Sequence, residues 1–327
     1  MTRATAALSA TPSVRRRRMR ALVADRGTVT LNSDRPTPIP LSNEVVVEVR
    51  AVGLCRTDLY VISGEIPSKN HIIPGHEFSG VVIETGCQVS QVTIGQRVVV
   101  DPIIPCEACG PCRHGRYHEC CDLGFLGLDS DGALAERVAV RACAVTPIPD
   151  DLDWTEAAFA EPVAAVLGVL KAGIRPDQVG LIFGDNRIAE LVHRVLIIEG
   201  FSCVQCCTLD QAREIPTESF DFIVETGLSI ESFSEMIRML RHRGRILLKS
   251  RQHVPVPIVL RDVLPKEPII EAVHYGRFDE AVRLLGDRRL AVDDLIGRVF
   301  DIEQWELALN TAKLDEQRKT FVTFGER

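Results

Sequence analysis

The chain has 327 residues, of which 46% are hydrophobic and 25% charged, with 38 Lys and Arg against 45 Asp and Glu. This length accommodates about two domains with a sizeable core, and no uninterrupted apolar run approaches the roughly 18 residues that span a membrane. An acidic chain with two Trp and three Tyr also lacks the basic grooves and stacking rings of a nucleic-acid surface. We therefore expect a globular protein that binds neither a membrane nor nucleic acid.

Residues 1–18 are rich in Ala, Ser, Thr and Arg and have no apolar periodicity. We predict a disordered tail, because nothing in this segment offsets the entropy of ordering it. Its composition suits either an organelle transit peptide or an extended start before Met19. Eleven cysteines, an odd count that includes adjacent pairs, favour a reducing cytoplasm in which thiolates bind metal rather than form disulfides.

The chain then changes from a strand pattern to alternating strands and helices. Short Val-rich runs separated by Gly, Pro, Asn and Asp predict a partly open β domain, and they lie at 19–24, 44–55, 78–85 and 96–102. A helical stretch follows at 154–173. Apolar strands that alternate with helical segments then predict a parallel sheet, and they lie at 179–184, 201–207, 220–227 and 244–250. Residues 295–312 predict a helix, and 318–324 a closing strand that returns to the first domain.

Four cysteines form a regularly spaced cluster in a loop rich in Gly and Pro. Cys106, Cys109, Cys112 and Cys120 have the pattern C-x2-C-x2-C-x7-C. Each two-residue spacing lets the backbone fold back and direct the next sulfur to the same point, so four thiolates can surround a zinc ion. Four protein ligands leave no open position, and we therefore predict a structural zinc.

A second set of metal ligands is spread over three segments. Cys55 lies in GLCRTDLY, His76 and Glu77 lie in IIPGHEFSG, and Glu161 lies in AFAEPVAAV. One thiolate, one imidazole and one or two carboxylates bind zinc while leaving room for water or substrate, which is the pattern of a catalytic site.

The order of these motifs resembles the zinc-dependent medium-chain alcohol and polyol dehydrogenase family over nearly all of residues 19–327. The motifs that carry the resemblance are MRALV, GLCRTD, PGHEFSGVV, GQRVVVDP, the cysteine cluster, LGLDSDGALAERV, AEP, FDFIVETG and GRILL. The resemblance implies an α/β protein with a GroES-like β-rich catalytic domain at 19–152 and 288–327. It implies a Rossmann-like, doubly wound parallel-sheet domain at 153–287, with the alcohol and carbonyl interconverted in the cleft between the two domains.

The resemblance also assigns roles to residues and places the chain in the sorbitol and threonine dehydrogenase branch, because Glu161 precedes a Pro. Cys55 and His76 match catalytic zinc ligands, and Glu77 and Glu161 match carboxylates that bind directly or through water. Thr57 matches the hydroxyl that takes the substrate proton, and Tyr60 occupies the next relay position. The implied cofactors are two zinc ions and NAD or NADP, the implied substrate is a polyol, cyclitol or amino alcohol, and the implied assembly is a homodimer or homotetramer.

The dinucleotide motif departs from the family pattern G-x-G-x-x-G/A. Gly184 and Ala189 fit, but Asn186 replaces the second Gly and Asp185 adds negative charge beside the phosphate. The second strand ends at Thr208 instead of an acid, and the 184–227 segment fits about two crossovers where the family has three. The Rossmann-like domain is therefore predicted to be trimmed.

Three functions remain compatible with this sequence. The first is a dehydrogenase with loosened NAD(P) recognition, in which Arg187 or Arg56 supplies the positive charge for the phosphate. The second is a redox-neutral zinc enzyme of the elimination type, and the third is an inactive scaffold on the same fold.

Overall fold

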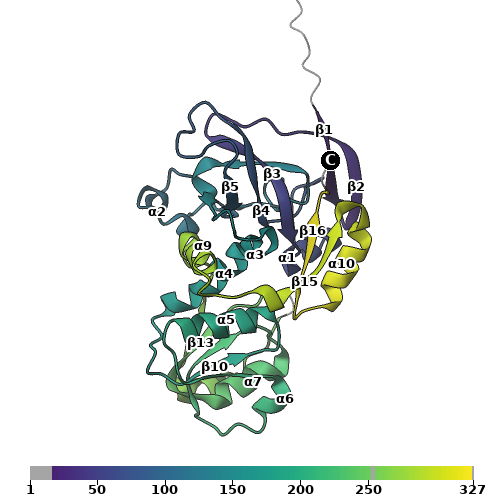
Figure 1. The fold of residues 1–327 in the computed structure, drawn as a ribbon. Coiled ribbons are helices and arrows are strands. Elements are labelled where there is room, and N and C mark those ends of the chain that lie inside the picture. The colour runs from purple at the N-terminus through teal and green to yellow at the C-terminus, as the bar shows by residue number, and fades with distance from the viewer. Residues whose placement is uncertain (1–16, 252–254, 326–327) are drawn as a thin grey trace, which may run out of the picture.

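The computed structural model describes residues 17–251 and 255–325, which form two lobes (Figure 1). The upper lobe in this view contains the strands near both ends of the described chain, and the lower lobe contains the middle segment. Most of the predicted tail, residues 1–16, lies outside the described residues. Arg17 and Arg18 are described, and Arg18 begins the first strand.

The upper lobe is built on a seven-stranded sheet. Its order is β15-β16-β3-β4-β5-β9, and β8 pairs with β3. The antiparallel pair β1-β2 and the short pair β6-β7 accompany it. The bounds are β1 (Arg18–Asp25), β2 (Thr28–Pro36), β3 (Glu44–Gly53), β4 (Glu77–Thr85), β5 (Arg97–Val100), β6 (Ile103–Ile104), β7 (Gly124–Phe125), β8 (Arg137–Arg141), β9 (Val145–Pro147), β15 (Ile296–Asp301) and β16 (Lys319–Thr323).

The lower lobe is a five-stranded sheet in which every pair is parallel, as the alternation of strands and helices predicted. Its order is β11-β10-β12-β13-β14. The bounds are β10 (Gly180–Phe183), β11 (Val204–Cys207), β12 (Phe220–Glu225), β13 (Leu240–Leu248) and β14 (Ile269–Ala272). A Cβ at Gly180 would lie 2.2 Å from the ring of Phe222 on the neighbouring strand, so this position needs glycine.

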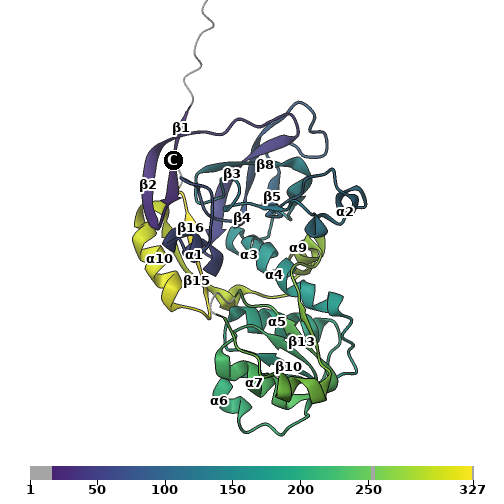
Figure 2. The same ribbon diagram turned by 180° about the vertical axis from the view of Figure 1, so that it is seen from behind.

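Helices cover both sheets and link the lobes. In Figure 2, α3 and α4 lie between the upper strands and the lower sheet, with α9 beside them. The core cluster runs through this junction, from Phe321 of the upper sheet to Phe222 of the lower one. The helices are α1 (Arg56–Ser63), α2 (Gly110–Arg113), α3 (Trp154–Ala158), α4 (Ala160–Leu167), α5 (Arg187–Ile198), α6 (Leu209–Ala212), α7 (Ile230–Met239), α8 (Leu260–Val263), α9 (Phe278–Gly286) and α10 (Trp305–Leu314).

Between β10 and β12 the chain makes only two crossovers, as its length predicted. The first contains α5, and the second contains the single-turn helix α6, which begins at the side-chain cap of Thr208. Thr208 therefore caps a helix at the place where the family pattern has an acid for ribose.

The sequence prediction is wrong for residues 296–301. We predicted a helix over 295–312, but Ile296–Asp301 forms β15 and the helix begins only at Trp305. The backbone of β15 pairs in parallel with β16, and Phe300 is buried in the core of the upper lobe. Pairing with β16 and burial of Phe300 thus outweigh the local helical pattern. The edge strand β14 was also not predicted.

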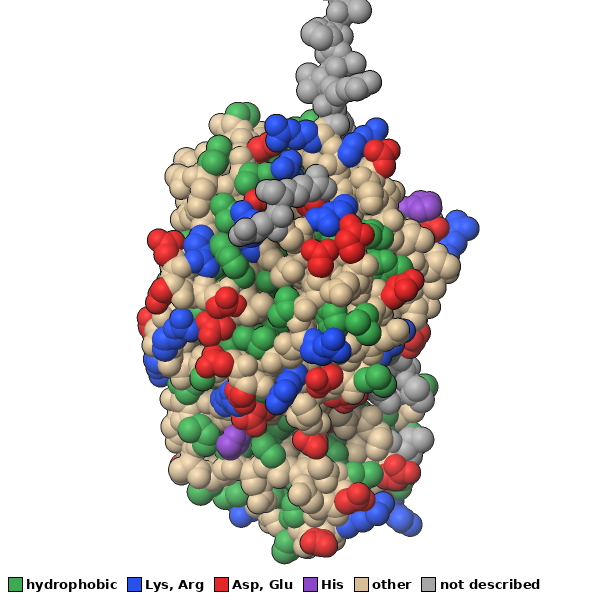
Figure 3. Space-filling view, turned by 45° about the vertical axis from the view of Figure 1, so that its right-hand side comes forward, with side chains coloured by type: hydrophobic (Ala, Val, Ile, Leu, Met, Phe, Trp, Pro, Cys, Tyr) green, Lys and Arg blue, Asp and Glu red, His purple; other side chains and the backbone are tan. Residues whose placement is uncertain are grey.

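Charged side chains of both signs lie on the surface. On the face in Figure 3, basic and acidic side chains are interspersed. Among the described residues, no helix combines the length and the apolar character needed to cross a bilayer.

Candidate active site

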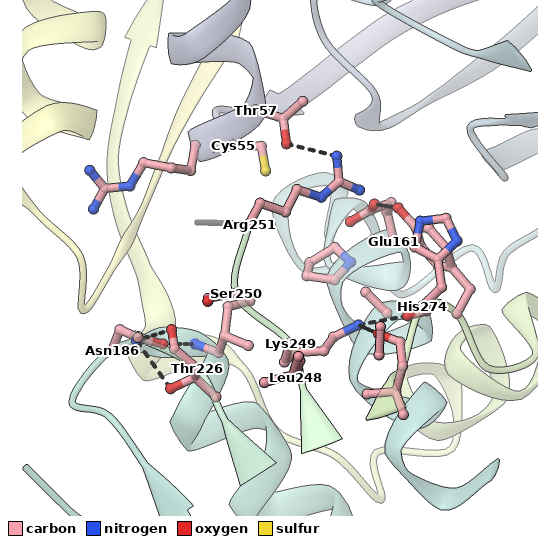
Figure 4. Close-up of a pocket in the computed structure, with 18 of the residues that line it drawn as sticks. Cys55, Thr57, Glu161, Asn186, Thr226, Leu248, Lys249, Ser250, Arg251 and His274 are labelled. Atoms are coloured by element: carbon pink, nitrogen blue, oxygen red, sulfur yellow. Dashed lines mark hydrogen bonds between the residues drawn. The ribbon is translucent and has the colours of Figure 1, made fainter. Parts of the chain in front are cut away.

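A cavity of about 620 Å³ lies between the lobes and contains the second set of predicted metal ligands (Figure 4). Its upper wall contains Cys55, Thr57 and His76, and its lower wall contains Asn186, Thr226 and the segment 248–251. The carboxyl ends of β10, β12 and β13 point to this cavity, which is the edge where open parallel sheets bind ligands.

Cys55 is placed by the start of α1. The helix begins directly after this residue, and the Cys55 N–H donates to Asp58 Oδ2 at 2.9 Å. Asp58 is the third residue of the helix, so its carboxylate folds back onto the helix start. The local sequence C-R-T-D thus fixes the thiol of Cys55 and the hydroxyl of Thr57 on the first turn.

His76 is held by the same carboxylate. Its Nδ1 lies 3.1 Å from Asp58 Oδ1, and that oxygen also accepts from the Gly75 N–H at 2.9 Å. Burial would lower the pKa of His76, but the charge and hydrogen bond of Asp58 raise it well above the ordinary value. With Nδ1 facing Asp58, Nε2 is the nitrogen left for a metal, which is the usual carboxylate–histidine–metal arrangement. Gly75 has φ of +99° and no room for a Cβ beside the Leu134 N, so only glycine fits before His76.

Glu77 forms a buried ion pair with Lys319, the first residue of β16. Both side chains are almost fully buried, and a Cβ at Gly53 would lie 2.7 Å from Lys319 Cδ. The missing side chain at Gly53 therefore makes room for this pair, which joins the C-terminal strand to the site.

Glu161 lies in the first turn of α4 and lines the same cavity. The buried hydroxyl of Tyr275 donates to Glu161 Oε1. Burial and the nearby charge of Glu77 raise the pKa of Glu161, while His76, Tyr275 and Lys319 oppose this rise.

These residues fit a zinc ion. Ligand atoms of Cys55, His76 and Glu77 all lie within 4.8 Å of one another. Sulfur, imidazole nitrogen and carboxylate oxygen are the donors that zinc prefers in catalytic sites. Glu161 is outside this set of three and lines the same cavity, so its place as a ligand remains a prediction.

Two cations that sequence reasoning missed also enter the cavity. Arg251 Nη1 donates to Thr57 Oγ1 at 3.3 Å, and its guanidinium carbon lies 5.6 Å from the ring centre of Phe125. Lys249 Nζ donates to the carbonyl of His274 at 2.6 Å, and burial lowers the pKa of Lys249 to about 8. Tyr60 lines the same cavity.

The four cysteines of the cluster also meet. Their sulfur atoms lie within 4.8 Å of one another, and the Cys109 and Cys112 sulfurs are 3.3 Å apart. Backbone N–H groups of Cys112 and Cys121 lower the pKa of Cys109 to about 6, which favours a thiolate. His114 and His118 bond to Gly110 O and Lys171 instead. The cluster therefore fits a structural zinc.

The dinucleotide turn does not fit its expected ligand. In the family pattern, the helix after the first strand offers its N-terminal N–H groups to the pyrophosphate. Here Asn186 Oδ1 accepts from both the Ile188 and the Ala189 N–H at 3.0 Å. The cations Arg56 and Arg187, predicted to meet the phosphate, both contact Glu316 instead.

Four contacts of this site were not predicted from sequence: Asp58 to His76, Lys319 to Glu77, Tyr275 to Glu161 and Arg251 to Thr57. Each joins segments far apart in the chain, and no spacing rule indicates such a pair. Only Asp58 had a local signal, because it stands three residues after Cys55 at a helix start.

Comparison with known proteins agrees with this architecture. Residues 41–150 match the family model of the alcohol dehydrogenase GroES-like domain. D-xylulose reductase A of Aspergillus oryzae is 26% identical over 88% of this chain and 92% of its own length. The 2-dehydro-3-deoxy-L-galactonate 5-dehydrogenase of Pseudoalteromonas atlantica is 27% identical over 80% and 85%.

Among solved structures, a protein of Sinorhizobium meliloti 1021, described as a zinc-binding dehydrogenase and bound to NADP, superimposes with a TM-score of 0.85. It is 25% identical, and the match covers 94% of this chain and 99% of that one. Fold and site thus define a two-domain enzyme of the medium-chain dehydrogenase type. Residues 41–150 carry an alcohol dehydrogenase GroES-like domain, and the similarity in sequence and fold over most of the chain supports the zinc-dependent medium-chain alcohol and polyol dehydrogenase family.

Proposed function

We propose that this chain is a zinc-dependent oxidoreductase that interconverts a polar secondary alcohol and its ketone. The observation that carries the proposal is the juxtaposition of Cys55, His76 and Glu77, with ligand atoms within 4.8 Å, in a cavity that both lobes line. Zinc bound there supplies a Lewis acid that lowers the pKa of a substrate hydroxyl. In the family the oxidation is paired with reduction of NAD(P), and two relatives in the solved structures carry NADP or NADH.

The proton of the substrate hydroxyl leaves through Thr57. Its Oγ1 is buried on the first turn of α1, next to Cys55, and it accepts a hydrogen bond from Arg251. One lone pair of Thr57 Oγ1 is left to accept from the substrate hydroxyl while the Thr57 O–H donates its own proton onward, so the residue can relay the proton without holding a second one. Tyr60, one turn further along the same helix, lines the cavity as the proposed next relay group.

Glu161 is proposed to bind the zinc directly or through water. Tyr275 orients its carboxylate, and burial with a nearby Glu77 favours the protonated form when no metal is bound. A carboxylate in this place suits a substrate that offers two polar groups to the metal, such as a polyol or cyclitol.

The cations of the lower wall favour a polyol that carries a negative charge. Among the described residues, Arg251 donates to the Thr57 hydroxyl and faces the Phe125 ring, and Lys249 lines the same cavity. A sugar acid would place its carboxylate against these cations, whereas an amino alcohol would bring a third positive charge. The similar dehydrogenase of P. atlantica is named for such an acid.

A redox-neutral zinc reaction is the second candidate, and the closed dinucleotide turn at Asn186 is the observation that favours it.

The chain is further proposed to act in the cytoplasm, where eleven free thiols fit a reducing environment. Domain boundaries at 152/153 and 287/288 and a homodimer or homotetramer complete the proposal.

The proposed proton transfer is tested at Thr57. Thr57→Val removes the hydroxyl and keeps the shape, so we expect turnover of a polyol to fall by about 100-fold or more. Thr57→Ser keeps the hydroxyl and should stay within a few-fold of the unaltered protein. Equal turnover for Val and Ser would contradict a proton path through this atom.

A further inference from the structure

The N-terminus of α5, where a pyrophosphate would bind, is already filled by the protein itself. The helix follows β10 and the turn Gly184-Asp185-Asn186. Its first three N–H groups all have protein acceptors: Arg187 N–H donates to Glu316 O, and the next two donate to Asn186 Oδ1, each at 3.0 Å. An arriving phosphate therefore meets no free donor among these three groups.

The Asn186 side chain is held at both ends. While its Oδ1 caps the helix, its Nδ2 donates to Thr226 O at 3.1 Å and to Thr226 Oγ1 at 3.3 Å (Figure 4). Thr226 follows β12, so Asn186 bridges the carboxyl ends of two neighbouring strands. Gly184 has φ of +136°, and a Cβ there would lie 2.2 Å from Thr226 Oγ1. The turn is thus packed around this one amide.

Residues 315–318, between α10 and β16, make a second set of contacts with this turn. Gln317 Nε2 donates to Asp185 O at 3.0 Å and to Asp185 Oδ1 at 2.9 Å. Glu316 forms an ion pair with Arg56, and its carbonyl accepts from Arg187 Nη1 at 3.3 Å. The segment covers the turn and engages both arginines that could neutralise a phosphate.

The charge of the adjoining cavity also opposes a phosphate. This cavity, of about 380 Å³, is lined by three carboxylates, those of Asp185, Glu190 and Asp294, and by one cation, Arg318. Arg194 neutralises part of this charge by pairing with Glu190 and Asp294. The turn itself still carries the negative charge of Asp185.

We propose that Asn186, covered by residues 315–318, blocks the phosphate-binding position at the N-terminus of α5. NAD(H) or NADP(H) then binds there only by displacing the side-chain amide of Asn186. The inference rests on the proposed function, because it concerns the cofactor which that function requires. Asn186→Gly restores the G-x-G pattern and frees two N–H donors while costing the helix little, since glycine is a tolerated N-cap. Two recovered bonds to a charged phosphate correspond to about 100-fold tighter binding.

The test is calorimetric titration of the zinc-loaded protein with NADH and, separately, NADPH. We expect weak binding by the unaltered chain and about 100-fold tighter binding of one of the two by Asn186→Gly. Asp153→Gly is the matched control, because the Asp153 side chain caps a different helix, α3, in the same way. This control should bind like the unaltered chain.

Two results would overturn the inference. One is equal affinity of the unaltered protein and Asn186→Gly, whether tight or undetectable, in samples that melt at similar temperatures. The other is tightening by Asp153→Gly to the same extent. The titration measures binding and not turnover. An Asn186→Gly protein that binds NADH or NADPH more tightly but oxidises no alcohol would therefore support the blocked phosphate-binding position and count against the proposed function alone.

Discussion

Asp58 lies 3.1 Å from Nδ1 of His76 and at the same time receives the backbone N–H of Cys55. One buried carboxylate thus positions two of the proposed zinc ligands from segments that are separated in sequence. Without it, His76 could rotate and present either nitrogen to the cavity.

Asp58→Asn is therefore expected to weaken zinc at the catalytic site by about 10- to 100-fold, the usual cost of losing such a support. Competition with a graded series of chelators measures this. The cysteine cluster should keep its own zinc, which provides an internal control. Unchanged affinity at the catalytic site in a folded variant would contradict the positioning role.

Cys109→Ser should lower the free energy of unfolding by about 4 kcal/mol or more, because binding of a structural zinc is coupled to folding. Zinc content should fall by one ion per chain. Cys121→Ser is the matched control, since Cys121 is exposed and outside the set of four sulfurs. The four-thiolate site would be wrong if both variants melted alike.

Arg251→Gln is expected to raise KM for a sugar acid by about 10- to 100-fold, through loss of a charged hydrogen bond, and to leave KM for the matching neutral polyol nearly unchanged. Steady-state kinetics on the two substrates separates charge recognition from a general disturbance of the cleft. An equal rise in KM for both substrates would show that Arg251 does not recognise the carboxylate of the sugar acid.

The ionisation of Asp101 makes the free energy of unfolding depend on pH. Burial raises its pKa to about 6, whereas the unfolded chain has about 3.9. As pH rises from 4 to 6 the unfolded chain releases this proton and the folded chain keeps it, so the free energy of unfolding falls, by at most roughly 3 kcal/mol.

Asp101→Asn removes this titration and keeps the acceptor for the Ile103 N–H. The melting temperature of the variant, relative to the unaltered protein, should therefore rise between pH 4 and pH 7. A difference that stays constant with pH would show that Asp101 has an ordinary pKa in the folded state.

The sequence predicted those parts of the molecule that depend on local patterns. Apolar runs between turn residues located β3, β4, β10 and β12, and the cysteine spacing located the four-sulfur cluster. It failed at β15, because the pattern around Phe300 gives no sign that β16 will pair beside it.

The cofactor turn is an intermediate case. The replacement of glycine by Asn186 predicted weaker phosphate binding at the start of α5, but not which contacts block the phosphate-binding position. The closing bonds reach Thr226 and residues 315–318, which come from other parts of the chain. Likewise, Cys55 and His76 were found from their motifs, whereas Lys319 and Tyr275 support the site from positions that only folding brings near.

The central claim is oxidation of a polar alcohol at the site of Cys55, His76 and Glu77. The most direct measurement is product analysis after incubating zinc-loaded protein with a panel of neutral and acidic polyols at high NAD or NADP concentration, beside Cys55→Ser. The account predicts that ketone and reduced nicotinamide appear in equal amounts, and that the Cys55→Ser protein, still folded, makes neither. A carbonyl product formed without reduction of the nicotinamide, or equal product from Cys55→Ser, would contradict it.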